Sequence, residues 1–450
     1  MNKTKLLLWS IVAALAGFIF GFDTVVISGA NLPIKELWHT TPLFHGFFIM
    51  SMALWGTVLG AIFGGIPTEK YGRKKVLLWI GILFSVSAVG SALAPGPYLF
   101  SFFRFIGGIG IGVSSVAAPT YISEISTAKT RGRLVGLYQF NIVFGILIAF
   151  FSNYLLKGVG GENDWRWMLG IMAIPALIYT LLVFTVPESP RWLITIRNNL
   201  AKAKEILVQI GEENPDAEIR NIISANESIK AKSSNQHLFA KKYEKVLWLA
   251  FFVAFFNQWS GINFILYYAP EILESAGLGA KESLFNSIAI GGTNLIFTFV
   301  GLYLIDRIGR KQLLLIGCFG YIISLAAVAW SFYAHAGNVF LLCSLMFFIA
   351  SHAIGQGAVI WVLISEIFPN NVRALGQSFG ASVHWVFAAL ITLITPVFLD
   401  KENGVFGDNP WPIFAFFCFM MVLQLVWILT KVPETRGVSL EDLEKKLIAH

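Results

Sequence analysis

GGIPTEKYGRKK, residues 64–75, joins two apolar stretches, and a near-copy, GLYLIDRIGRK, stands at residues 301–311. In both, an apolar run leads to an acidic residue, and a Gly-Arg pair follows with further basic residues. A short cationic turn between two membrane-length runs is typical of a cytoplasmic loop, because Lys and Arg accumulate on that side of a membrane. Two such turns predict a membrane protein that arose by duplication.

The composition of the 450-residue chain also favours a membrane protein. Apolar residues make up 56% of the sequence and charged residues 13%, whereas about 25% of a soluble domain is charged. The net charge of +7 does not indicate a nucleic-acid partner, because the basic residues cluster in short loops beside apolar runs. The three cysteines lie in separate apolar runs and form no metal-binding spacing, so we expect neither a metal site nor a cofactor.

Twelve apolar runs are long enough to cross a bilayer, which takes about 20 helical residues. We expect an all-α protein with spans at 8–30, 44–66, 76–95, 98–122, 133–156, 166–186, 246–270, 283–305, 312–334, 338–364, 374–398 and 410–431. The first run is too long for a cleaved signal peptide, so we expect it to remain as a span. Because the loops at 67–75, 123–133, 306–311 and 366–373 carry most of the short-loop Lys and Arg, we expect both termini to be cytoplasmic.

The spans divide the chain into four regions. We expect a six-helix bundle at 1–187, a polar linker at 188–243, a second six-helix bundle at 244–433 and a cytoplasmic tail at 434–450. Apolar residues recur at helical spacing in the linker, which predicts two or three amphipathic helices on the cytoplasmic side. A small soluble binding domain is the alternative, although a segment of this length is marginal for an independent core.

The two halves also share acidic motifs in the same order and at a nearly constant offset. Glu69 corresponds to Asp306, Glu124 in YISEI to Glu366 in LISEI, and Glu188 in PESPR to Glu434 in PETRG. Together with GFDTVVISGA (21–30), RFIGGIGIG (104–112) and NQWSGINFILYYAP (257–270), these motifs resemble the sugar porter family of the major facilitator superfamily, and within it the bacterial sugar–proton symporters. The resemblance implies two six-helix bundles that rock about a central sugar site.

Asp23 lies about midway along the first span, where an unpaired carboxylate is costly. Its functional interpretation is a proton carrier, and the alternative is a carboxyl group capped by nearby backbone or hydroxyl groups. Arg104 at the start of the fourth span is the natural counter-ion, and it stays charged at any relevant pH. The symporters that the chain resembles have this Asp and Arg, whereas facilitative glucose carriers usually have Asn at the position of Asp23. The difference favours proton coupling.

A sugar site needs amides for the hydroxyl groups and aromatic rings for the apolar faces. Single polar residues within spans are more often contacts between helices, but this set matches sugar porter positions. The candidate sugar-binding residues are Gln139, Asn257, Gln258, Asn263, Tyr268, Asn294, Trp361 and His384.

Three residues depart from the family pattern. Asn257 replaces a Gln, Ala358 replaces a Pro in the tenth span, and His384 stands where relatives carry Gln or Asn. His384 either donates to a sugar hydroxyl, senses pH or is a packed polar residue. The loss of the Pro predicts a weaker helix break. Because all three changes bear on substrate choice, the resemblance does not define the sugar.

The loop motifs predict a further function. Gly72 permits a tight turn and Arg73 can reach a carboxylate. The resemblance implies a cytoplasmic ion-pair network that clamps the outward-open state, and the alternative is charge that only sets topology. The expected members of this gate are Glu69, Arg73, Glu124, Arg131, Glu188, Asp306, Arg310, Glu366, Arg373 and Glu434.

We therefore expect a monomeric transporter in the cell membrane, the inner membrane if bacterial, that imports a monosaccharide with a proton. The partners are the sugar, the proton and the lipid bilayer, and enzyme activity is not expected. A sugar uniporter on the same fold is the first alternative. A membrane sugar sensor is the second, although its usual long extensions are missing, and a drug exporter is the third, although the amides of the seventh span suit polyhydroxyl ligands better.

Overall fold

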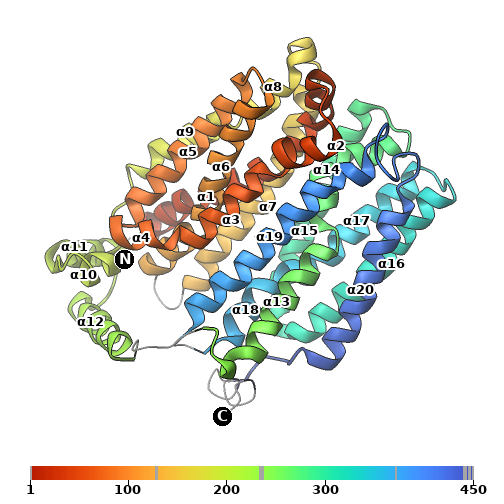
Figure 1. The fold of residues 1–450 in the computed structure, drawn as a ribbon. Coiled ribbons are helices and arrows are strands. Elements are labelled where there is room, and N and C mark those ends of the chain that lie inside the picture. Colours follow the sequence, from red (N-terminus) through yellow and green to blue (C-terminus); the bar gives the residue numbers. More distant parts are fainter. Residues whose placement is uncertain are drawn as a thin grey trace.

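A computed structural model of the chain describes residues 3–126, 130–232, 238–369 and 372–438, together with Leu443 and Leu447. The described residues form two helical bundles side by side (Figure 1). Within these described ranges, eleven helical segments are long and apolar enough to cross a membrane, and a pair of helices bent by 43° makes a twelfth span when the pair is counted as one. The predicted all-α fold with twelve spans is therefore confirmed.

The first bundle contains the helices that precede the linker. They are α1 (Lys3–Trp38), α2 (Pro42–Phe44), the π-helix η1 (His45–Met50), α3 (Met52–Phe63), α4 (Gly65–Tyr71), α5 (Arg73–Leu93), α6 (Pro97–Ile125), α7 (Arg131–Leu156), η2 (Gly161–Asn163), α8 (Asp164–Gly170) and α9 (Ala173–Val183). The twelfth span is the bent pair of 42–50 and 52–63. Helix α1 continues well past residue 30, where the sequence predicted its end.

The second bundle repeats this arrangement after the linker. Its helices are α13 (Glu244–Trp259), α14 (Ile262–Ser275), α15 (Ala280–Ile308), α16 (Arg310–Tyr333), α17 (Asn338–Ile354), α18 (Gln356–Ile367), α19 (Arg373–Leu399) and α20 (Trp411–Lys431). The seventh and tenth spans, predicted as single runs, are each divided into two helices.

Glycines account for both divisions. Gly261, between α13 and α14, has a φ of +86°, which few residues other than glycine adopt. Gly355 separates α17 from α18 and packs against Gly317 of α16, where a Cβ atom on either glycine would lie within 2.8 Å of the other's Cα atom. The tenth span is thus divided at Gly355, three residues before Ala358, so the absence of the proline does not leave the helix continuous there.

The polar linker lies at one end of the bundles. Its described residues form α10 (Pro190–Thr195), α11 (Leu200–Ile210), α12 (Pro215–Lys232) and the short η3 (Lys241–Tyr243). Figure 1 shows α10 and α11 beside α4 at the lower left, whereas α2, α8 and α14 lie at the opposite end. We call these two ends the linker end and the far end. The predicted tail at 434–450 lies largely outside the described residues.

The outer faces of the helices are apolar. Leu93, Leu181, Ile323 and Trp330 are among many large apolar side chains that are exposed on the surface of the protein. A soluble protein of this size would not expose so much apolar surface. The chain is therefore a multi-pass membrane protein whose outer surface faces lipid.

Candidate functional site

The buried ion pair predicted in the first bundle is present. Asp23 of α1 is 0% exposed and Arg104 of α6 is 1% exposed. A terminal nitrogen of Arg104 pairs with the Asp23 carboxylate, and the other donates to the Asp23 carbonyl oxygen over 3.2 Å. Among the described residues, the second carboxylate oxygen of Asp23 has no hydrogen-bond partner. Removing one partner of such a buried pair costs about 3–5 kcal/mol, because the other charge is left buried without compensation.

An amide cluster lies in the second bundle, at the division between α13 and α14. Gln258 donates to the Asn257 side-chain oxygen over 2.9 Å and accepts from the Asn263 amide over 2.9 Å. The same Gln258 nitrogen lies 3.2 Å from Nε2 and 3.3 Å from Nδ1 of His384 on α19, and it donates to whichever nitrogen is unprotonated. The structure therefore brings four of the predicted sugar-binding residues into one network.

Aromatic rings flank this network. The His384 ring lies between Trp361 of α18 and Trp385, with ring centroids 4.9 and 4.8 Å away. Trp361 is partly exposed, at 39%. Trp385 also contacts Phe20 of α1, with centroids 5.7 Å apart, and Phe20 lies three residues before Asp23. Ring contacts thus connect the amide cluster of the second bundle to Phe20 of α1, the helix that carries Asp23.

Other predicted sugar-binding residues lie apart from this network. Tyr268 donates its hydroxyl to the Thr392 carbonyl oxygen over 2.8 Å, within the second bundle. Gln139 of α7 is half-buried and Asn294 of α15 is buried, and no hydrogen bond joins either to the amide cluster among the described residues. Tyr267, the neighbour of Tyr268, is not among the predicted sugar-binding residues, and it hydrogen-bonds the Thr24 side chain beside Asp23.

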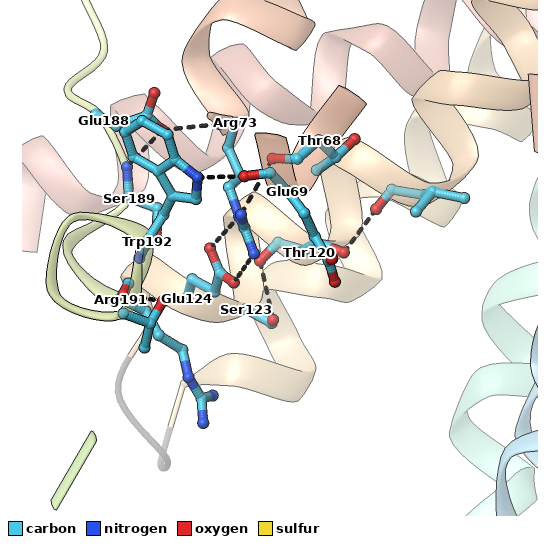
Figure 2. Close-up of polar contacts among 12 residues, drawn as sticks. Thr68, Glu69, Arg73, Thr120, Ser123, Glu124, Glu188, Ser189, Arg191 and Trp192 are labelled. Carbon is cyan, nitrogen blue, oxygen red and sulfur yellow. Dashed lines mark hydrogen bonds and ion pairs between the residues drawn. The ribbon is translucent and has the colours of Figure 1, made fainter. Parts of the chain in front are cut away.

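The GGIPTEKYGRKK motif, residues 64–75, contributes to a polar cluster at the linker end (Figure 2). Arg73 binds Glu124 through two parallel hydrogen bonds of 2.8 Å and donates to the Thr68 carbonyl oxygen over 3.1 Å. Glu188 accepts from the backbone N–H groups of Arg73 and Lys74 over 2.9 and 3.1 Å. Helix α5 is therefore held at its first turn to both α6 and the chain after α9.

The second bundle repeats this cluster almost atom for atom. Arg310 binds Glu366 over 2.8 and 3.1 Å and donates to the Ile305 carbonyl oxygen over 3.0 Å. Glu434 accepts from the backbone N–H groups of Arg310 and Lys311 over 2.9 and 3.0 Å. In addition, the Thr435 hydroxyl donates to Glu366 over 2.6 Å. Each cluster joins residues of one bundle, and neither crosses to the other.

The two capping glutamates differ in their electrostatics. Burial is the largest influence on Glu188 and raises the pKa of its carboxyl group above the usual value, although backbone N–H donors oppose the rise. Burial also acts to raise the pKa of Glu434, but N–H groups of Arg436, Arg310 and Lys311 outweigh it and the pKa is lowered. As pH falls, Glu188 therefore loses its charge before Glu434 does.

The remaining predicted gate residues take little part in these clusters. The Glu69 side chain is exposed. The main-chain carbonyl oxygen of Glu69 accepts from the Trp192 indole over 2.6 Å. Asp306 is exposed and lies 3.2 Å from Arg310. Arg131 is exposed at the start of α7, and Arg373 donates to the Phe368 carbonyl oxygen over 3.2 Å. Among the described residues, no ion pair joins Arg131 or Arg373 to an acidic side chain.

We expect Gly72→Ala to destabilise the protein more than Gly65→Ala. Gly72 has a φ of +98°, and a Cβ atom there would lie 2.4 Å from a carboxylate oxygen of Glu188. Strained backbone of this kind costs about 1–3 kcal/mol. A Cβ atom at Gly65 would meet nothing within 4 Å, so this variant is the matched control. Thermal unfolding in detergent measures the difference, and equal unfolding temperatures for the two variants would contradict the prediction.

Comparisons with known proteins agree with this architecture. Residues 9–447 match the sequence model of the family described as "Sugar (and other) transporter". An arabinose-proton symporter of Bacillus subtilis is 33% identical over 98% of this chain and 94% of its own length. A D-xylose-proton symporter of Escherichia coli is 32% identical over 98% and 96%. The solved structure of the E. coli xylose transporter XylE in a partially occluded inward open conformation superposes with a TM-score of 0.85, at 31% identity over 97% of this chain and 100% of that one.

Proposed function

Because this chain belongs to the sugar transporter family, we propose that it is a secondary transporter that imports a monosaccharide together with a proton by alternating access. The observation that carries the proposal is the fully buried Asp23–Arg104 pair on a helix, α1, that also contacts the aromatic rings beside a cluster of amides. A carboxylate without other charged partners can exchange a proton, and an amide cluster flanked by aromatic rings can bind a sugar.

The proton cycle follows from the different chemistry of the two paired groups. Arg104 keeps its charge throughout, so Asp23 is the group that carries the proton in the proposed cycle. A proton from outside neutralises Asp23 and releases it from Arg104, which permits closure around the sugar. When the site faces inward, the ion pair forms again and expels the proton. The cycle returns without cargo once the sugar has left.

The sugar site combines the amides and rings of the second bundle with polar residues of the first. Asn257, Gln258 and Asn263 would bind hydroxyl groups, and Trp361 would lie against an apolar face of the sugar. Across the interface, α7 and α15 face each other through the Phe140 and Phe299 rings, 5.4 Å apart. The proposed site also includes Gln139 of α7, Asn294 of α15, Tyr268 of α14 and His384 of α19.

At the linker end we propose a gate in which Arg131 and Arg373 have a role distinct from that of the two clusters. The Arg73–Glu124 and Arg310–Glu366 pairs hold each bundle rigid at this end. Arg131 and Arg373 begin helices beside these pairs and form no ion pair among the described residues, so they are available to reach acidic groups of the opposite bundle when the linker end closes. Glu69, Glu188, Asp306 and Glu434 complete this charged face.

The membrane orientation follows from charge. The turns at the linker end carry Arg73, Lys74, Arg310 and Lys311, and basic residues accumulate on the cytoplasmic side. We therefore assign the linker end and both termini to the cytoplasm, and the protein to a bacterial inner membrane. Because one chain supplies every residue of the proposed site, we assign a monomer.

Uptake into proteoliposomes tests the proposed function. Labelled pentoses, hexoses and polyols are offered one at a time, with and without an imposed pH gradient that is acidic outside. We expect one group of monosaccharides to accumulate above its external concentration only when the gradient is present. Uptake that stops at the external concentration under both conditions would contradict proton coupling, and uptake of none of these sugars would contradict sugar transport.

We expect His384→Gln to change the preference between monosaccharides by about tenfold in kcat/KM, because one altered hydrogen bond discriminates on this scale. The side chain lies against Gln258 and between two tryptophans, so it would contact the sugar directly. The matched control is His335→Gln, at an exposed position after α16. Competition between two labelled sugars measures the ratio, and an unchanged ratio would place His384 outside the sugar site.

A further inference from the structure

A chain of buried hydrogen bonds at the far end plays no part in the site described above. The Thr40 hydroxyl lies 2.8 Å from Nδ1 of His45, and Nε2 of His45 lies 2.7 Å from the Asn31 side-chain oxygen. The Asn31 amide nitrogen donates to Glu271 over 2.6 Å. Asn31, His45 and Glu271 are all buried. Of the four residues, Glu271 alone belongs to the second bundle, so the chain crosses between the halves at Asn31.

The donors in this chain all point in one direction. Thr40 donates to Nδ1 of His45, the N–H group at Nε2 donates to Asn31, and Asn31 donates to the Glu271 carboxyl group. A neutral imidazole protonated at Nε2 satisfies every one of these contacts. Each member therefore depends on its neighbour, and the carboxyl group of Glu271 depends on Asn31.

A second contact crosses between the bundles nearby. Lys35 of α1 forms an ion pair with buried Asp400 at the end of α19, which also accepts from the backbone N–H groups of Glu402 and Asn403 over 3.0 and 2.8 Å. Burial acts to raise the pKa of Asp400, but Lys35 and Asn403 outweigh it and the pKa is lowered. Of the ion pairs between described residues, this is the one that joins the two bundles.

The backbones of the two bundles also touch here. A Cβ atom added to Gly46 of η1 would lie 1.9 Å from the Leu393 carbonyl oxygen of α19. Only glycine permits this approach, which brings the bent second span against the eleventh. The far end is therefore closed by direct packing, whereas the charged clusters at the linker end stay within their own bundles.

We propose that Asn31, Lys35, His45, Glu271 and Asp400 form a far-end latch, which locks this end closed while the sugar site is open to the linker end. The proposal rests on the proposed alternating access, in which the two bundles separate at one end at a time. To open, Glu271 must leave Asn31 and Asp400 must leave Lys35. Besides these residues, the charged group that faces Glu271 is Glu274 on its own helix. The latch thus sets the equilibrium between the state that is open at the far end and the state that is open at the linker end.

The test measures distances in the purified protein without sugar. Native Cys318, Cys343 and Cys418 are first replaced by serine. Spin labels on cysteines at exposed Glu162 and Glu402 then report on the far end, and a separate pair at exposed Lys75 and Gln312 reports on the linker end. Double electron–electron resonance gives the two distance distributions for the parent protein and for Asn31→Ala.

Asn31→Ala removes both hydrogen bonds of Asn31, and a bond to a charged group shifts such an equilibrium by about tenfold. We therefore expect the ratio of far-end-open to far-end-closed molecules to rise by about tenfold, with a matching shift to shorter linker-end distances. Lys35→Ala is expected to act in the same direction, and it tests the latch independently if Asn31→Ala does not fold. Lys204→Ala, which breaks the exposed Lys204–Asp216 pair in the linker, is the control and should change neither distribution.

Unchanged far-end distances in both latch variants would overturn the proposal. The same result would leave the proposed function intact, because these distances are measured without sugar or a pH gradient. Conversely, proteoliposomes that take up no sugar would contradict the proposed function without affecting the distances. The two ideas therefore fail separately.

Discussion

Replacing Asp23 with Asn is expected to abolish sugar accumulation while leaving sugar exchange intact. The Asn side chain keeps the shape of the carboxyl group and can still accept a hydrogen bond from Arg104, but it cannot carry a proton. The variant should therefore bind sugar and still change between its outward-facing and inward-facing conformations with sugar bound. Because no proton is moved, the internal sugar concentration should rise no higher than the external one.

The size of this effect follows from the proton gradient. A membrane potential of 100 mV contributes about 2.3 kcal/mol per proton and one pH unit about 1.4 kcal/mol. Together they supply about 3.7 kcal/mol, which sustains a concentration ratio of roughly 500-fold for one proton per sugar. Under these conditions the parent protein can approach this ratio of internal to external sugar concentration. For Asp23→Asn, the ratio should remain near one.

Two assays with one control separate coupling from damage. Counterflow exchange of labelled sugar shows that the variant is folded and binds its substrate, and uptake under an imposed gradient measures accumulation. Asp216→Asn makes the same chemical change in an exposed ion pair of the linker and should leave both assays unchanged. Accumulation by Asp23→Asn would remove this residue from the proton path.

A second large effect is expected for Gln258→Ala. This variant should raise the Kd for sugar by about 30- to 100-fold. Gln258 contacts Asn257, Asn263 and His384, so its loss removes one sugar ligand and leaves its neighbours without a partner. Unmade hydrogen bonds of buried amides cost about 1–3 kcal/mol each. Isothermal titration calorimetry in detergent measures the affinity directly.

The control for this variant is Gln377→Ala, because Gln377 is exposed on α19, the helix that also carries His384. We expect its Kd to match that of the parent protein. A Gln258→Ala variant that is stable and binds sugar with parental affinity would show that the amide cluster holds helices together and does not bind the sugar.

The repeated sequence motifs predicted most of the fold. Apolar runs of membrane length define the spans, and α19 at Arg373–Leu399 agrees closely with the predicted 374–398. The family resemblance implied a set of charged residues without saying which of them pair, and the structure pairs Arg73 with Glu124 and Arg310 with Glu366. Asp23 stood out because a carboxylate within an apolar run needs a partner.

The divisions of the spans and the far-end contacts could not be predicted in the same way. Hydropathy sums over a window, so the seventh span appears continuous although Gly261 interrupts it. Asn31 and Lys35 lie where the first apolar run fades, which predicts a loop. They are instead helical, because Glu271 and Asp400 of the other bundle satisfy them. Partners so distant in sequence become apparent only when the bundles are packed together.

The central claim, that sugar and proton enter together, is tested most directly by the pH of the medium. A sugar identified by the uptake panel is added to lightly buffered, de-energised cells that contain the protein, and a pH electrode follows the suspension. The account predicts that the medium becomes alkaline at once, by about one proton per sugar taken up, and that cells with Asp23→Asn give no change. Sugar uptake by the parent protein at constant external pH would contradict the account and identify a passive carrier.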